Sequence, residues 1–352
     1  MGGEFEIELD LLLRSPNQQE PSLPLPYGLW TDTGRSALLL AATDILQSGG
    51  APVVWLPAFC CQSVTRTFQQ AGFTPRYYSS DELHGERGAE PKPERGETFL
   101  IVHYFGHYNR RRARAAESWR RDGVFVVEDA VQAVLSGGVG RIGHYAVTSF
   151  RKFLPQPDGA LLGSHRPLNA ALASPDERFV SGRVLGKLLR GAQAPAASFL
   201  PLLDESEALY AAATIVPREA SWLGRQLLAR SDLAAIAAKR RHNHQALHRM
   251  LTERAARALS PLLGTLADDE VPLGLPVRIR AGRRDALRRH LAAHSVFCAV
   301  HWPLPQVPDD AGCAADHLLA SDILTLPIDQ RMGAAHLERL VSLVEYFVTE
   351  TQ

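Results

Sequence analysis

One lysine and one aspartate in the middle of the chain form the pair of residues best suited to chemistry. Of the 38 lysines and arginines only four are lysines, and Lys152 follows a short apolar run at 145–148. A lysine amine can lose its proton and form a Schiff base, which an arginine guanidinium does not do. Asp129 follows an apolar, β-branched run at 124–127 that predicts a buried strand. Both side chains are therefore expected at strand ends, where α/β sheets bind ligands.

A cofactor that forms a Schiff base would use both residues of this pair. Pyridoxal 5'-phosphate needs a lysine on its aldehyde and a carboxylate on its pyridine nitrogen, which keeps the ring protonated as an electron sink. Lys152 and Asp129 could supply these two groups. The two residues taken alone fit equally well an ordinary loop lysine and a strand-end cap.

A possible phosphate site lies closer to the N-terminus. The segment 31–47, TDTGRSALLLAATDILQ, predicts a helix that Asp32 or Thr33 caps and that opens with Gly34, Arg35 and Ser36. The free backbone N–H groups at such an opening can bind a phosphate. A plain capped helix is the alternative for this segment.

Strands and helices alternate along residues 30–165, which predicts an α/β fold with a mostly parallel, doubly wound sheet. We expect a large domain at 1–232, with an N-terminal arm and a helical insertion at 166–216. A small C-terminal α/β domain is expected at 233–352. It would contain a strand in 271–279, a helix at 283–294, the segment 296–305 and a closing amphipathic helix near the end. His301 and Trp302 could either approach the mouth of the site or pack in the core.

Composition argues against several classes of protein. Acidic and basic residues balance at 38 each, so bulk charge indicates neither a nucleic-acid nor a membrane partner. No apolar run is long enough to span a bilayer. The four cysteines show no metal-binding spacing, so no metal is expected, and a reduced, cytoplasmic location is the simplest interpretation.

Several motifs in order resemble one family of enzymes. The segments EDAVQAVLSG (128–137), SFRK (149–152) and PDGALL (157–162), preceded by TGRSALLLA (33–41) and VVWLPAFCCQSV (53–64), are similar to motifs of the DegT/DnrJ/EryC1/StrS aminotransferases. The resemblance implies the fold type I of pyridoxal-phosphate enzymes, an aspartate aminotransferase-like fold. It also implies a homodimer with sites at the subunit interface.

The same resemblance implies roles for individual residues. Lys152 would carry pyridoxal 5'-phosphate and Asp129 would hold its ring nitrogen, and the further cofactor-binding positions would be Gly34, Arg35, Ser36, Gln132 and Ser149. Gln132 is expected beside the phenolic oxygen, and Ser149 on the phosphate. The family places an aromatic residue against the cofactor ring in the turn after the second strand. That position aligns with Cys61, so either Phe59 stacks on the ring or Cys61 packs against it through its sulfur.

Two departures from the family bear on the substrate. Ser149 and Lys152 are separated by two residues, fewer than the family commonly shows, and 166–216 is an insertion that could close over the substrate. The expected reaction moves an amino group from a donor, by analogy glutamate, to a carbonyl acceptor such as a nucleotide-linked keto sugar. Dehydration, decarboxylation or racemisation with the same cofactor is one alternative. A non-catalytic, cofactor-binding regulator or scaffold is the other.

Overall fold

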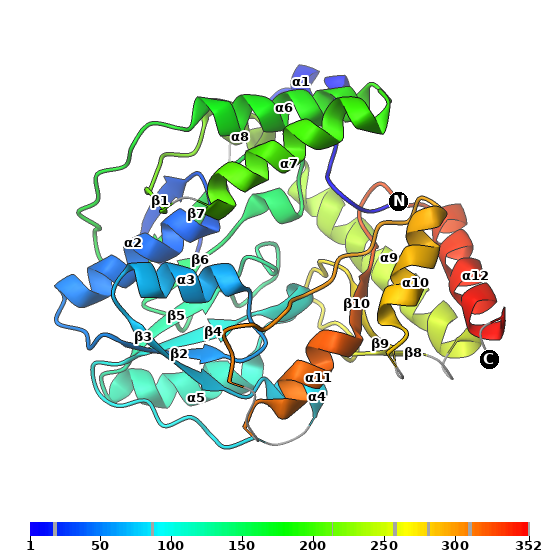
Figure 1. The fold of residues 1–352 in the computed structure, drawn as a ribbon. Coiled ribbons are helices and arrows are strands. Elements are labelled where there is room, and N and C mark those ends of the chain that lie inside the picture. Colours follow the sequence, from blue (N-terminus) through cyan, green and yellow to red (C-terminus); the bar gives the residue numbers. More distant parts are fainter. Residues whose placement is uncertain are drawn as a thin grey trace.

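The structure is a computed structural model that describes residues 1–16, 20–85, 88–212, 214–255, 259–279, 282–308 and 312–350. Its centre is a seven-stranded sheet in the order β1-β7-β6-β5-β4-β2-β3 (Figure 1). The strands are β1 (Tyr27–Thr31), β2 (Val53–Pro57), β3 (Thr74–Tyr78), β4 (Thr98–Val102), β5 (Phe125–Asp129), β6 (Tyr145–Val147) and β7 (Ala160–Ser164). Five neighbouring strands of this order, β6-β5-β4-β2-β3, pair in parallel. Strand β7 runs antiparallel to both of its neighbours, β1 and β6.

Helices cover both faces of this sheet, as the alternating sequence predicts. Figure 1 shows α2 (Gly34–Gln47) and α3 (Gln62–Gln70) over one face and α5 (Arg110–Arg121) over the other. Along β4, Leu100 and Val102 join the core beneath α2, whereas Phe99 and Ile101 join the core beneath α5. This alternation is the side-chain period of a strand buried on both faces.

The insertion forms a helical hairpin above the β1–β7 edge of the sheet (Figure 1). It consists of α6 (Glu177–Gly191) and α7 (Ala196–Ala212), and α8 (Trp222–Ala229) follows it. The N-terminal arm contains a short helix, α1 (Leu9–Leu13), and packs on α6 through the backbone bond from Ile7 N to Lys187 O.

The C-terminal part builds a second, three-stranded antiparallel sheet in the order β10-β9-β8. Its elements are α9 (Leu233–Arg254), β8 (Leu259–Pro261), β9 (Leu275–Ile279), α10 (Arg284–Ala293), α11 (Ala314–Asp322), β10 (Ile323–Leu326) and α12 (Ala334–Glu350). Residues 296–305 run extended beside this sheet, where Ala299 forms an isolated bridge to Thr325. The two sheets together confirm the predicted fold class, a mostly parallel sheet with a smaller C-terminal α/β part.

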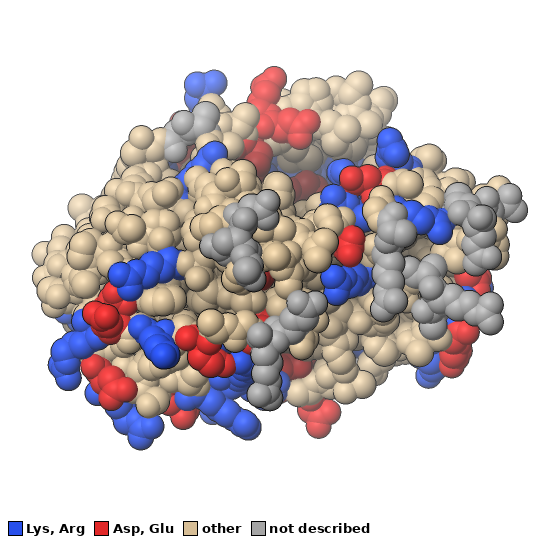
Figure 2. All heavy atoms as spheres, turned by 60° about the horizontal axis from the view of Figure 1, so that its bottom comes forward, with Lys and Arg blue, Asp and Glu red and all other residues tan. Residues whose placement is uncertain are grey.

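The arginines of α5 pair with acidic residues of neighbouring segments. Arg112 contacts Asp81 at 2.8 Å and Glu90 at 3.0 Å, and Arg111 contacts Asp81 at 2.7 Å. On the face shown in Figure 2, acidic and basic side chains are likewise intermixed. Among the described residues, no helix has the length and apolar character required to cross a lipid bilayer.

Candidate active site

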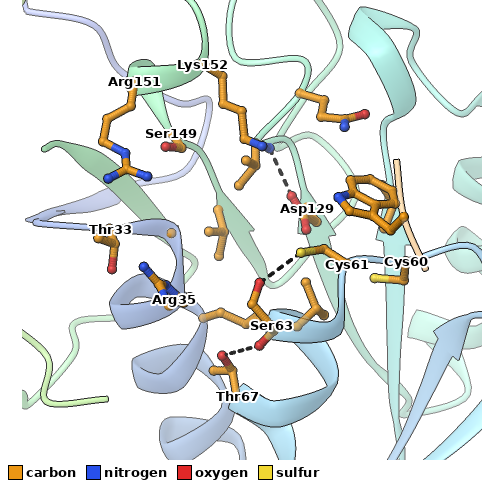
Figure 3. A pocket seen from close by; sticks show the side chains of 18 of the residues that line it. Thr33, Arg35, Cys60, Cys61, Ser63, Thr67, Asp129, Ser149, Arg151 and Lys152 are labelled. Carbon is orange, nitrogen blue, oxygen red and sulfur yellow. Dashed lines mark hydrogen bonds between the residues drawn. The ribbon is translucent and has the colours of Figure 1, made fainter. Parts of the chain in front are cut away.

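A cavity of about 280 Å³ lies where the carboxyl ends of β4, β5 and β6 meet the N-terminus of α2 (Figure 3). Seven of the residues that the sequence predicts for the site line it: Gly34, Arg35, Cys61, Asp129, Gln132, Ser149 and Lys152. Of the chain's four lysines, Lys152 is the one that lines this cavity. The sheet therefore gathers residues that are far apart in the sequence at one edge.

Asp129 and Lys152 face one another across this cavity. Asp129 ends β5 and pairs in register with Val147 on β6, and Lys152 lies in the 3-10 turn (Phe150–Lys152) that follows β6. The Lys152 amine points toward the Asp129 carboxylate (Figure 3). Burial raises the pKa of Asp129, while a backbone bond from Val131 N at 2.9 Å and the charge of Lys152 act in the opposite direction.

Gln132 presents an unused hydrogen-bond donor in this region. Its Oε1 accepts a bond from Phe105 N at 2.9 Å, which fixes the orientation of the amide. Its Nε2 is buried and has no hydrogen-bond partner among the described residues, although Gln132 lines the cavity. A buried, unpaired donor beside a cavity is a costly arrangement that a ligand acceptor would relieve.

The opening of α2 forms one wall of the cavity. Thr33 caps the helix by accepting a bond from Ser36 N at 3.3 Å, as the sequence predicts. Gly34 lets the helix approach the sheet closely, since a Cβ there would stand 3.1 Å from Val131 Cγ2. Ser149, which precedes the turn that carries Lys152, also lines the cavity. Ser36 is buried and is not among the lining residues.

The turn after β2 directs Cys61, not Phe59, into the cavity. Phe59 is fully buried and packs against Trp302, with ring centroids 5.3 Å apart. Trp302 itself lines the cavity, so the C-terminal segment supplies the aromatic surface there. His301 is not among the lining residues, and its Nδ1 bonds Thr325 Oγ1 at 3.0 Å. Burial, with the charge of Lys152 acting in the same direction, lowers the pKa of its imidazole to about 3.

Two charged residues that the sequence did not single out also line the cavity, Arg151 and Glu207. Glu207 comes from α7 of the insertion and contacts Arg35 at 3.5 Å and Arg151 at 3.4 Å. The charge of Arg151 is the largest of the influences that lower the pKa of Glu207. Arg151 stands inside the SFRK motif and could have been noticed there. The sequence connects Glu207 to the site only through its place in the insertion that could close over the substrate.

Similarity to known proteins is visible in three dimensions and not in sequence. No family model matches the chain, and no curated protein matches it. Among solved structures, a DegT DnrJ EryC1 StrS aminotransferase from Brucella abortus has a TM-score of 0.61 at 16% identity, over 92% of this chain and 87% of that one.

Two further solved structures show the same relationship. Sugar aminotransferase CalS13 from Micromonospora echinospora gives a TM-score of 0.60 at 15% identity, over 91% of this chain and 87% of that one. NtdA from Bacillus subtilis, solved with bound cofactor PMP, gives a TM-score of 0.65 at 13% identity, over 92% of this chain and 74% of that one. The chain therefore has the fold type I architecture of the DegT/DnrJ/EryC1/StrS aminotransferases.

Proposed function

We propose that this protein is a pyridoxal-phosphate-dependent aminotransferase that moves an amino group from an amino donor to a carbonyl acceptor. The observation that supports this most strongly is the pair Lys152 and Asp129, facing one another in a single cavity. A nucleophilic amine opposite a buried carboxylate is the combination that a Schiff-base cofactor with a cationic ring requires.

The remaining residues of the cavity fit this cofactor group by group. Ser149 and the opening of α2 at Gly34 and Arg35 offer donors to a phosphate. The unpaired Nε2 of Gln132 offers a donor to a phenolic oxygen. When bound, pyridoxal phosphate supplies an electron sink that stabilises negative charge on the neighbouring carbon of an amino acid.

Four of the residues that line the cavity would then have separate roles. The Nζ of Lys152 would hold the cofactor and, once released from it, would be the base that moves a proton from the donor's α-carbon to the C4′ carbon of the cofactor. The Asp129 carboxylate would keep a proton on the ring nitrogen, and that positive charge would offset the burial that raises the pKa of Asp129. Trp302 and Cys61 line the cavity and would help to exclude water from it.

The finer assignment, a glutamate donor and a nucleotide-linked keto sugar acceptor, is part of the same proposal. Its support is the shared fold with proteins that include the sugar aminotransferase CalS13. We also propose that the protein is a homodimer. Light scattering can test this by measuring its mass in solution.

A visible absorption spectrum tests the cofactor assignment directly. Purified protein supplied with pyridoxal phosphate should show the visible band of the lysine-bound cofactor, and Lys152→Ala should lose it. Lys92→Ala, at an exposed loop position, is the matched control and should keep the band. An unchanged band in Lys152→Ala would rule out Lys152 as the attachment point.

A second measurement separates transamination from other chemistry of the same cofactor. Glutamate added in the absence of an acceptor should convert the cofactor to its amine form and release a keto acid in equal amount. Failure of a panel of amino donors to do so would favour dehydration, decarboxylation or racemisation. A cellular role that survives Lys152→Ala would favour the regulator.

A further inference from the structure

Two arginines from different parts of the chain converge on one side of the cavity. Arg35 belongs to the first turn of α2, and Arg151 to the turn that carries Lys152. Both guanidinium groups lie away from Asp129 and on the side of Ser149 (Figure 3). Their common partner is Glu207 of α7.

The contacts between these arginines and Glu207 are loose. They measure 3.5 Å for Arg35 and 3.4 Å for Arg151, whereas a well-formed guanidinium–carboxylate bond measures about 2.7–2.9 Å. In the described part of the chain, the hydrogen bonds of Arg151 go to Glu207 alone. Arg151 therefore has donors left for another anion.

Glu207 has a stronger partner that would keep it in place if the two arginines turned away. Arg183 of α6 donates to Glu207 at 2.9 Å and to Glu4 of the N-terminal arm at 2.9 Å. Lys187 adds a bond to Glu4 at 2.7 Å. In this network four cations contact two carboxylates, and Asp32 and Asp158 add their negative charges near Arg35 and Arg151.

We propose that Arg35 and Arg151 form a binding site for a phosphate dianion, and that Glu207 is a built-in counter-ion that competes with it. An arriving dianion would take the two guanidinium groups from Glu207, which then relies on Arg183. The insertion would thus set how tightly the site holds an anion.

The dianion could come from two sources, and only this choice rests on the proposed function. One is the phosphate of the cofactor itself, and the other is a phosphate of the acceptor substrate. Both would meet the same donors, so the experiment must separate them.

Inorganic phosphate is the probe, titrated calorimetrically into cofactor-free protein and into protein saturated with pyridoxal phosphate. Arg151→Gln should weaken binding by about tenfold or more, the effect of losing a charge-assisted bond. Glu207→Gln should tighten it by about three- to fivefold, since a partly exposed competing charge is removed. Glu205→Gln, an exposed acid on the same helix, is the control and should bind like wild type.

The gain expected of Glu207→Gln is the decisive result, because misfolding cannot produce it. Phosphate binding that disappears on cofactor loading would identify the cofactor's phosphate as the natural occupant. Binding that persists in the loaded protein would identify the acceptor. The inference is overturned if wild type binds no phosphate, if Arg151→Gln binds as wild type does, or if Glu207→Gln gains nothing. None of these outcomes depends on the visible band that tests the cofactor assignment.

Discussion

Gln132 allows cofactor binding to be separated from folding by two substitutions at one position. Its Oε1 accepts the bond from Phe105 N, and its Nε2, beside the cavity, has no partner in the part of the chain that the structure describes. Gln132→Glu keeps an acceptor for Phe105 N but replaces the free donor with a carboxylate oxygen. Gln132→Leu removes both functions.

The two variants should rank in opposite orders in two assays. Leaving the buried Phe105 N–H unpaired costs about 1–3 kcal/mol, so Gln132→Leu should lose more unfolding free energy than Gln132→Glu. Losing a donor to a charged phenolic oxygen costs about 1.5–3 kcal/mol, or about 10- to 150-fold in affinity. Repulsion between carboxylate and phenolic oxygen should weaken Gln132→Glu further, so that it binds cofactor worst.

Urea unfolding of the cofactor-free proteins measures the first order, and equilibrium dialysis against pyridoxal phosphate measures the second. If Gln132→Glu bound the cofactor as tightly as wild type while folding normally, the role assigned to Nε2 would be wrong. If affinity simply followed stability in both variants, Gln132 would act through the fold alone.

Three further predictions concern the surroundings of the site. Gly106→Ala should lower the free energy of unfolding, measured in urea, by more than about 2 kcal/mol, because φ is +97° and a Cβ would stand 2.1 Å from Val271 O. Gly72→Ala is the control: its φ is +98°, but a Cβ would meet open space, so it should lose only about 1 kcal/mol. Burial raises the pKa of Asp158 to about 6, so the folded state loses stability as pH rises from about 4 to 6. Asp158→Asn cannot ionise, so between pH 4 and pH 7 its free energy of unfolding should rise relative to that of wild type by up to about 3 kcal/mol. A difference in unfolding free energy that does not change with pH would contradict this. Cofactor loading should quench tryptophan emission, and Trp302→Phe should remove most of that quenching if Trp302 lies against the ring.

The central sheet and the edge that carries the site were predictable from the sequence. Strands β5 and β6 begin and end within two residues of the apolar runs that predict them. Buried parallel strands have continuous apolar sequences, which makes them easy to recognise. Because such strands end at one edge, Asp129 and Lys152 could be expected to meet.

Local sequence was less informative where tertiary contacts decide the structure. Strands β8 and β10 are short and pair only within the C-terminal sheet, so their sequences carry little signal. The alignment left Phe59 and Cys61 as alternatives for the cofactor ring, and the path of one turn determines which of them faces the cavity. The role of Trp302 depends on an extended segment that returns from the far end of the chain.

The Lys152 segment joins two strands that are neighbours in the same sheet. Ladder bonds anchor it on both sides, at Val147 on β6 and at Leu162 on β7. Between these anchors, Phe150 and Phe153 are buried in a core cluster and Asp158 accepts bonds from Ser221, so the packing of the segment fixes the positions of Ser149 and Lys152. In protein engineering, 148–159 would therefore have to be exchanged together with its contacts on α8, whereas a single-residue insertion inside either strand would shift the reactive amine away from its acid.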